Sequence, residues 1–414
     1  MLIIFAEILI LFFFLKKQRF IHRNLLLFIS LLLQAVILTL YRVELTSIWN
    51  RQVYWSDAEY YWNGILQLLD GNMGGFNNFG YILYGALIQM TSPFKSVFWN
   101  NLSNLLILDL SFVIGLEILR DEFLGKKVPT YVYLTTILNP LVIYSLLRNL
   151  KDVLFLFLTI LSVYIYFIYF KRRRSLPSQV VFFTLYLIFF ITSLVSVRPW
   201  GFIIPFLVLF VHFFRLISVQ RLGMKLALVV LLLILIYVFI SLYLKNIIIW
   251  LEARENLLEK GYSEYKKLGV LGYFLGVFRL ILGPGPIRSM FGSQRYFQFY
   301  TYIGNVCSSI GSLLWYFTLP IYVINLKSIP KITGRFPSRI FSLLILALFV
   351  VIYVYFYYGS TELRFRGVIY VLTSISLLIP SERVINSNFK SSNLISVYAL
   401  TLLFLTIPAI FLSI

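Results

Sequence analysis

Long apolar runs, separated by short polar stretches, follow one another along almost the whole chain. A helix needs about 20 mostly apolar residues to cross a bilayer, and the runs are near that length. The pattern therefore predicts an all-α polytopic membrane protein with about 12 transmembrane helices. We expect the crossings at residues 1–15, 24–42, 97–119, 128–147, 152–170, 180–197, 200–214, 226–244, 301–323, 340–358, 367–380 and 394–413.

Two longer segments lie between these runs. Residues 43–96 are predicted to form a first external loop with interfacial helices, and residues 245–300 a second. The second contains "LEARENLLEKGYSEYKKLG" (251–269), in which charges of both signs accompany leucines at helical spacing. This is typical of an amphipathic helix on a membrane surface. The "GPGPIRSMFG" stretch that follows predicts turns, and we expect a mobile loop there.

The composition agrees with this interpretation, since hydrophobic residues make up 60% of the chain and charged residues only 13%. A soluble domain of this length would need more charge to cover its core. We find no repeat of fixed period and expect one integral-membrane domain over residues 1–414. The first residues, "MLIIFAEILILFFFLKK", lack the basic start and small-residue cleavage site of a signal peptide, so we expect a retained helix.

Basic loops with few or no acids identify the cytoplasmic side. They include residues 16–23, 171–174, 215–225 and 327–339, while residues 120–127 are mixed but still mainly basic. The formal net charge of +20 is therefore explained by loop bias and by anionic lipid headgroups, not by nucleic acid. We expect a multi-pass protein of a plasma membrane, specifically a bacterial inner membrane.

Other chemistry is sparse. Cys307 is the only cysteine, which excludes an internal disulfide and a thiolate metal site. The histidines, His22 and His212, lie in or beside basic cytoplasmic stretches, where interfacial placement is favoured over catalysis. The chain contains no P-loop pattern.

Two carboxylates stand out in the first external loop, in "YWSDAEYYWNG". In an extended segment Asp57 and Glu59 would point the same way, whereas on a helix only one could face a site. An external carboxylate near the membrane can act as a general base or bind a divalent cation, or it can simply be solvated.

Charged residues also gather where later runs meet the external side. Arg148, Lys151 and Asp152 lie at one such turn, where Asp152 can complement a helix N-terminus. Arg198 lies at another. Glu362, Arg364 and Arg366 lie at a third, and arginines spaced by two could grip a phosphate with several N–H donors. Headgroup contact is the alternative for each, but together they predict an external site for an anionic group.

The order of these elements resembles the GT-C class of integral-membrane glycosyltransferases, which includes protein O-mannosyltransferases and the aminoarabinose transferase of lipid A. The likeness is carried by "SDAEYYWNGILQLLDGN", "GYILYGALIQ", "LNPLVIYSLLRNLKDVLFLFL" and "ELRFRGVIYVLTSISLL", within residues 43–380. The chain departs from the class in having two helices before the acidic loop, Asp-Ala-Glu in place of adjacent acids, and "GVIY" where a proline pattern is usual. Polysaccharide repeat-unit polymerases share the extra helix and the arginines.

The resemblance implies transfer from a sugar on a polyprenyl phosphate or diphosphate to an acceptor hydroxyl on a glycan, lipid or protein. Asp57 would be the base, with Glu59 second, and Asp152 the acid of the next external loop. The candidate phosphate ligands would be Arg148, Lys151, Arg198, Arg364 and Arg366, with Glu362 beside them. No cofactor is required, although a divalent cation would be compatible. A repeat-unit polymerase is one alternative and a flippase or transporter of lipid-linked oligosaccharide is another.

Overall fold

The computed structural model is helical throughout the residues that it describes, and no strand occurs among them. These are residues 1–54, 57–72, 74–123, 126–170, 176–219, 237, 241, 248, 251–252, 254–256, 266–283, 301–326, 337–360, 362–378, 396 and 398–403. Four predicted segments lie wholly or largely outside these ranges: the crossing at 226–244 except residues 237 and 241, most of the crossing at 394–413, the "GPGPIRSMFG" stretch after its first residue, and much of 251–269.

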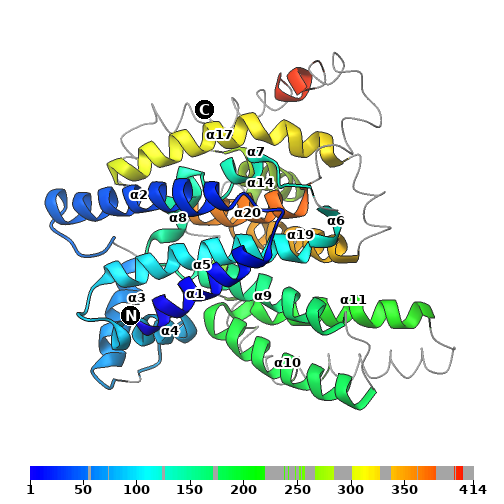
Figure 1. Cartoon of the computed structure of the whole chain (residues 1–414), viewed down its shortest axis with the longest axis horizontal. Coiled ribbons are helices and arrows are strands. Elements are labelled where there is room, and N and C mark those ends of the chain that lie inside the picture. The colour runs from blue at the N-terminus through cyan, green and yellow to red at the C-terminus, as the bar shows by residue number, and fades with distance from the viewer. Residues whose placement is uncertain are drawn as a thin grey trace.

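Figure 1 shows the arrangement of the helices, most of which coincide with apolar runs of the sequence. In order they are α1 (Leu2–Lys17), η1 (Leu25–Ser30), α2 (Leu31–Val43), η2 (Glu44–Ile48), α3 (Asp57–Leu69), α4 (Phe79–Thr91), α5 (Val97–Ile118), α6 (Arg120–Phe123), α7 (Thr130–Leu134), α8 (Pro140–Leu147), α9 (Asp152–Phe170), α10 (Leu176–Val197), η3 (Pro199–Phe202), α11 (Ile203–Val219), α14 (Val270–Leu282), α17 (Tyr302–Asn325), α19 (Pro337–Tyr357) and α20 (Leu363–Ser376).

Five helical segments in the described residues are long and apolar enough to cross a membrane. They are Phe28–Ile48, Val97–Ile118, Asp152–Tyr169, Tyr302–Asn325 and Arg339–Tyr357. A membrane protein is therefore supported, but the predicted number of about 12 crossings is not confirmed. Several predicted crossings form helices that are too short to span alone, including the 14-residue α20.

The predicted crossing at 128–147 is wrong as a single helix. It consists of two short helices, α7 and α8, separated by residues 135–139. Asn139 caps α8 by accepting a hydrogen bond from the backbone N–H of Leu141 at 2.9 Å, and Pro140 occupies the first helical position. A proline there cannot continue a helix from the preceding residues. The Ser30 hydroxyl donates to the Ile137 carbonyl at 3.2 Å, so this backbone group in the break has a hydrogen-bond partner in a neighbouring helix.

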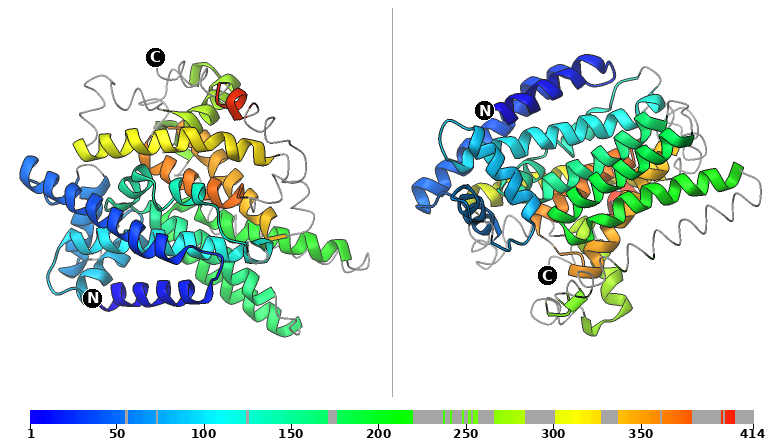
Figure 2. Two further views of the ribbon diagram at one scale, coloured as in Figure 1. Left: turned by 45° about the horizontal axis from the view of Figure 1, so that its top comes forward. Right: turned by 90° about the horizontal axis from the view of Figure 1, so that it is seen from below.

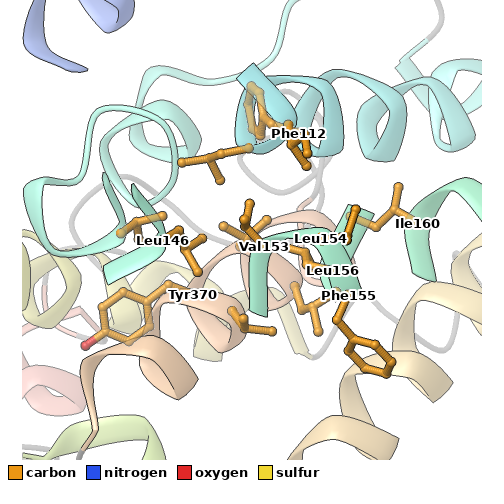
Figure 3. Packing of buried hydrophobic residues seen from close by; sticks show 14 of the residues in the cluster. Phe112, Leu146, Val153, Leu154, Phe155, Leu156, Ile160 and Tyr370 are labelled. Atoms are coloured by element: carbon orange, nitrogen blue, oxygen red, sulfur yellow. The ribbon is translucent and has the colours of Figure 1, made fainter. Parts of the chain in front are cut away.

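The core lies where α5, α8, α9 and α20 pack together, and Figure 3 shows its apolar side chains. Phe112 of α5, Val153 and Phe155 of α9 and Tyr370 of α20 are all almost fully buried. All of α20 except Arg364 is buried, so this helix is enclosed by protein. In Figure 1 it lies inside the bundle, while α10 and α11 extend from one side.

Contacts between distant segments group the predicted cytoplasmic stretches at one end of the bundle and the predicted external stretches at the other. At one end, Gln18 of a predicted cytoplasmic stretch donates to Glu117 at 2.9 Å, close to where the predicted crossing at 97–119 meets the predicted cytoplasmic residues 120–127. At the other, the Asn149 amide donates to the Ala58 carbonyl at 3.1 Å, joining two predicted external stretches. The views in Figure 2 show α1 packed along the outside of the bundle, in agreement with its contacts to α5.

The first predicted external loop contains η2 and the α-helices α3 and α4, and the second contains α14. α14 crosses the turn before α20 so closely that a Cβ on Gly359 would come within 1.7 Å of the Gly276 carbonyl oxygen. Gly359 also has a positive φ of 61°. The turn that leads to Glu362 and Arg364 thus depends on glycine at both positions.

Candidate functional site

The turn between α8 and α9 is fixed in place by Asn149, which lies between two charged residues. Its amide donates to the Ala58 carbonyl of α3, and its side-chain oxygen accepts a hydrogen bond from the Tyr81 hydroxyl of α4 at 3.0 Å. Asn104 of α5 donates to the Arg148 carbonyl at 3.3 Å. This turn is therefore a fixed support that holds the start of α9 against α3.

Asp152 begins α9 and forms an ion pair with Arg198, which precedes η3. Both side chains are buried, with exposed fractions of 0% and 5%. The Arg198 guanidinium also lies 5.7 Å from the centre of the Phe155 ring and 5.9 Å from that of Phe365. The pairing brings together two external turns that are 46 residues apart in the sequence.

Asp57 and Arg364 form a second ion pair beside the first, and it links the first residue of α3 to the first turn of α20. The Nε of Arg364 is also 2.6 Å from a Glu362 carboxylate oxygen. The Asp57 side chain is 44% exposed and that of Arg364 only 18%. One carboxylate oxygen of Asp57, Oδ1, accepts no hydrogen bond from the described residues.

Lys151 lies near both ion pairs. Its charge interacts with those of Asp57, Asp152, Arg198 and Arg364, but no carboxylate of the described residues is within ion-pair distance of it. Its amine lies 5.7 Å from the centre of the Tyr61 ring. The cluster thus contains two arginines that already have carboxylate partners and one lysine that does not.

The electrostatics of the cluster follow from this arrangement. Burial alone would raise the pKa of Asp57, but the nearby Arg364 outweighs it and holds that pKa below its usual range. Burial and the positive charge of Arg198 lower the pKa of Lys151 to about 7, although Asp152 opposes the shift. Asp57 is therefore ionised at neutral pH, whereas Lys151 is poised near its midpoint.

Three predicted site residues lie outside this cluster. Because α3 is helical from Asp57 onward, Glu59 points elsewhere and is 3.5 Å from Arg51 in an exposed ion pair. Arg148 instead lies over the rings of Tyr54 and Tyr144, at 5.2 and 5.3 Å.

Arg366 is fully buried and donates to Ser312 at 3.2 Å and to the Tyr370 hydroxyl. Residues two apart on a helix point in nearly opposite directions, so Arg364 and Arg366 contact different helices. The expectation that these two arginines grip one phosphate is wrong for this arrangement, because α20 is helical at both positions.

Two buried acids inside the bundle escaped the sequence analysis. Asp109 of α5 accepts a hydrogen bond from Gln34 at 2.8 Å, and Glu7 of α1 accepts from Ser103 at 2.6 Å. Neither has a basic partner among the described residues. Each acid interrupts an apolar run by only one residue, which is why hydropathy did not identify it. Asn149 was missed for a different reason: its role depends on hydrogen bonds to helices that are distant in the sequence.

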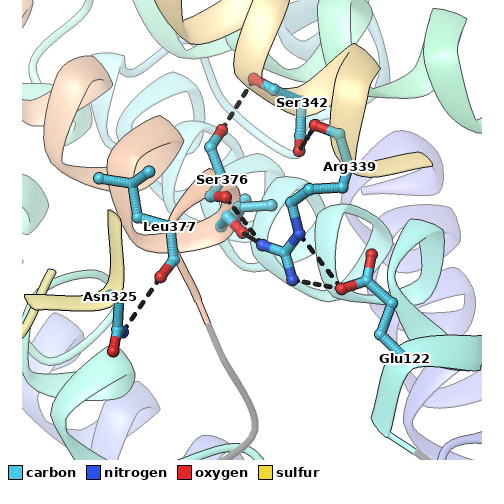
Figure 4. Close-up of polar contacts among 7 residues, drawn as sticks. Glu122, Asn325, Arg339, Ser342, Ser376 and Leu377 are labelled. Carbon is cyan, nitrogen blue, oxygen red and sulfur yellow. Dashed lines mark hydrogen bonds and ion pairs between the residues drawn. The ribbon is translucent and has the colours of Figure 1, made fainter. Parts of the chain in front are cut away.

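The opposite end of the bundle contains a buried ion pair between Glu122 and Arg339 (Figure 4). Arg339 donates to one Glu122 oxygen from Nε at 3.2 Å and from Nη2. Its Nη1 donates to the carbonyls of Ile375 and Ser376 at 3.1 and 2.7 Å. Every nitrogen of this guanidinium has a partner, so the pair closes the C-terminus of α20.

Within the described ranges, no three His, Cys, Asp or Glu side chains gather where they could hold a metal ion. No family model, curated protein or solved structure matches this chain. The end of the bundle that is predicted to be external holds a group of interacting charged residues, the charged cluster, which consists of Asp57, Lys151, Asp152, Arg198, Glu362 and Arg364.

Proposed function

We propose that the protein transfers a sugar from a polyprenyl phosphate or diphosphate to an acceptor hydroxyl at the external face of the membrane. The single observation that supports this best is the charged cluster itself. It combines cations suited to a phosphate with a half-exposed carboxylate, at the end of the bundle predicted to be external. Cations stabilise a phosphate leaving group, and a carboxylate can accept the hydroxyl proton.

In the proposed reaction the acceptor oxygen forms a bond to the anomeric carbon of the sugar. The bond between that carbon and the phosphate oxygen breaks, and its electron pair leaves with the phosphate. The acceptor proton passes to Asp57, whose Oδ1 is available while Oδ2 pairs with Arg364. Arg364 makes Asp57 a weaker base but keeps it ionised and oriented.

The test is Asp57→Asn, assayed with purified protein and a panel of polyprenyl-linked sugars. Asparagine cannot accept the proton, so transfer should fall by about 10²–10⁴-fold while donor binding remains. Glu59→Gln is the matched control, because Glu59 lies on the same helix but outside the cluster, and it should retain transfer. Near-normal transfer in Asp57→Asn, with loss in Asp152→Asn, would move the base to α9.

A repeat-unit polymerase would use the same chemistry with a growing glycan as acceptor. A transporter of lipid-linked oligosaccharide is a second candidate, and Asp109 and Glu7 favour it, because ionisable groups inside a membrane protein commonly mark a transport path. The variant Asp109→Asn distinguishes a transferase from a transporter. A transferase should keep its transfer activity in this variant, whereas a transporter should lose flipping of a fluorescent lipid-linked sugar in vesicles.

A further inference from the structure

The charged cluster divides its cations into two kinds. Arg198 and Arg364 each have a carboxylate partner, and for Arg198 the partner is as buried as the arginine. Separating such a pair leaves a buried charge without compensation, which is costly. These arginines are therefore poorly placed to exchange their carboxylates for a substrate phosphate.

Lys151 has no such partner, because it lies in the same cluster and no carboxylate in the described part of the chain is at ion-pair distance from it. The charged groups that act on it come from four parts of the fold: Asp57 from α3, Asp152 from α9, Arg198 from the turn after α10, and Arg364 from α20. The Tyr61 ring covers one side of the amine. An anion at Lys151 would also be attracted by the two arginines without displacing their partners.

We propose that Lys151 is the residue that receives the phosphate of the lipid-linked donor, while Asp152–Arg198 and Asp57–Arg364 remain intact as its frame. This inference rests on the proposed function, and it narrows five candidate phosphate ligands to one primary ligand. Arg198 and Arg364 are then positioning residues: they hold Asp152 and Asp57 in place, and their positive charges attract the phosphate.

The electrostatics support the same assignment. Burial and Arg198 lower the pKa of Lys151 to about 7, so the amine loses its charge as the pH rises above neutrality. A bound phosphate supplies the missing negative charge and favours the protonated amine. Phosphate binding should therefore be accompanied by proton uptake at alkaline pH, and should weaken between pH 6 and 9.

The experiment compares binding of a polyprenyl monophosphate with binding of the matching polyprenol, using purified full-length protein in lipid nanodiscs. The two probes differ only in the phosphate, so the ratio of their affinities reports on the anion site alone. We expect the wild-type protein to prefer the phosphate and Lys151→Gln to reduce that preference by about 10- to 100-fold, as expected for a charged hydrogen bond. Glu59→Gln should leave the ratio unchanged.

Lys151→Arg provides the second measurement, since arginine keeps its charge across the whole pH range. The phosphate itself gains charge near neutral pH, and this variant reports that effect alone. Relative to Lys151→Arg, the wild-type preference should fall as the pH rises from 6 to 9. A wild-type profile parallel to that of Lys151→Arg would overturn the inference.

The outcomes separate the two proposals. If wild-type protein does not distinguish the phosphate from the alcohol, the proposed function fails. If it does distinguish them and monodisperse Lys151→Gln distinguishes them equally well, the proposed function stands and the assignment of Lys151 is wrong.

Discussion

The two ends of α20 both carry buried arginine–carboxylate pairs, yet they differ in how completely those pairs are satisfied. Arg339 has a partner for each nitrogen, through Glu122 and two backbone carbonyls. At the other end, Asp152 Oδ2 and Arg198 Nε are buried and form no hydrogen bond with the residues that the structure describes, and none of their carboxylates is at ion-pair distance from Lys151. A complete network stabilises a fold, whereas an incomplete one leaves groups for a ligand.

The two ends of the bundle can differ in function in this way only if they face opposite sides of the membrane. Thiol labelling of a cysteine placed at each end tests this with an all-or-none result. Asp70 and Asp121 are both exposed, one at each end. In a Cys307→Ser background, a membrane-impermeant thiol reagent added from outside should modify Asp70→Cys and not Asp121→Cys. The reverse pattern would place the charged cluster in the cytoplasm and remove its access to an external acceptor.

Removing one partner from the complete pair should give the largest loss of stability. Arg339→Ala removes the buried ion pair with Glu122 and the donor to two carbonyls at the end of α20, so we expect a loss of about 3–5 kcal/mol, measured by unfolding in detergent. The double variant Glu122→Leu/Arg339→Met should recover much of this, since an apolar pair of similar size carries no stranded charge. Equal stability of wild type and Arg339→Ala would show that the pair contributes nothing.

The turn before α20 tests whether the charged cluster depends on backbone geometry. Gly359→Ala forces a side chain into a positive φ and against the Gly276 carbonyl, so we expect about 1–3 kcal/mol of destabilisation. The effect should reach donor binding, because Glu362 and Arg364 follow directly. Gly75→Ala is a matched control, since a Cβ there meets nothing within 4 Å. Similar behaviour of the two variants would contradict the role of the turn.

A smaller effect on stability is expected at Glu44, which lies at the same end as the charged cluster but whose two carboxylate oxygens both accept hydrogen bonds. Its carboxylate accepts hydrogen bonds from the backbone N–H groups of Tyr302 and Ile303, at the start of α17. Glu44→Gln should cost about 0.5–2 kcal/mol of stability through the weakened helix cap, with the phosphate preference unchanged. A selective loss of phosphate binding in this variant would extend the site to α17.

Helices formed by long, nearly uninterrupted apolar runs were the easiest to predict. The crossings expected at 97–119, 152–170 and 301–323 correspond closely to α5, α9 and α17, because a long apolar run with polar ends has few alternatives. The break at 135–139 was missed, since hydropathy does not register the Asn139 cap and Pro140 as a helix start.

The charged cluster could be predicted only in outline. Each external turn was recognisable as polar, but the partners were not, because Asp57 and Arg364 are 307 residues apart. Arg364 and Arg366 contact different partners because α20 is already helical at both positions. Lys151 is left without a carboxylate at ion-pair distance among the described residues because Asp57 pairs with Arg364 and Asp152 pairs with Arg198. The Glu122–Arg339 pair was missed for the same reason, since each residue fits an ordinary cytoplasmic loop when considered alone.

The enclosure of α20 has a consequence for how the protein is made. At 14 residues it is about 21 Å long, less than the roughly 30 Å of hydrocarbon in a bilayer, and it includes Arg364 and Arg366. A segment this short and this polar is a poor substrate for insertion by itself. Its neighbours α8, α9, α17 and α19 all precede it in the chain. We therefore expect α20 to insert during synthesis into a site formed by earlier helices, so that its arginines contact protein partners and not lipid.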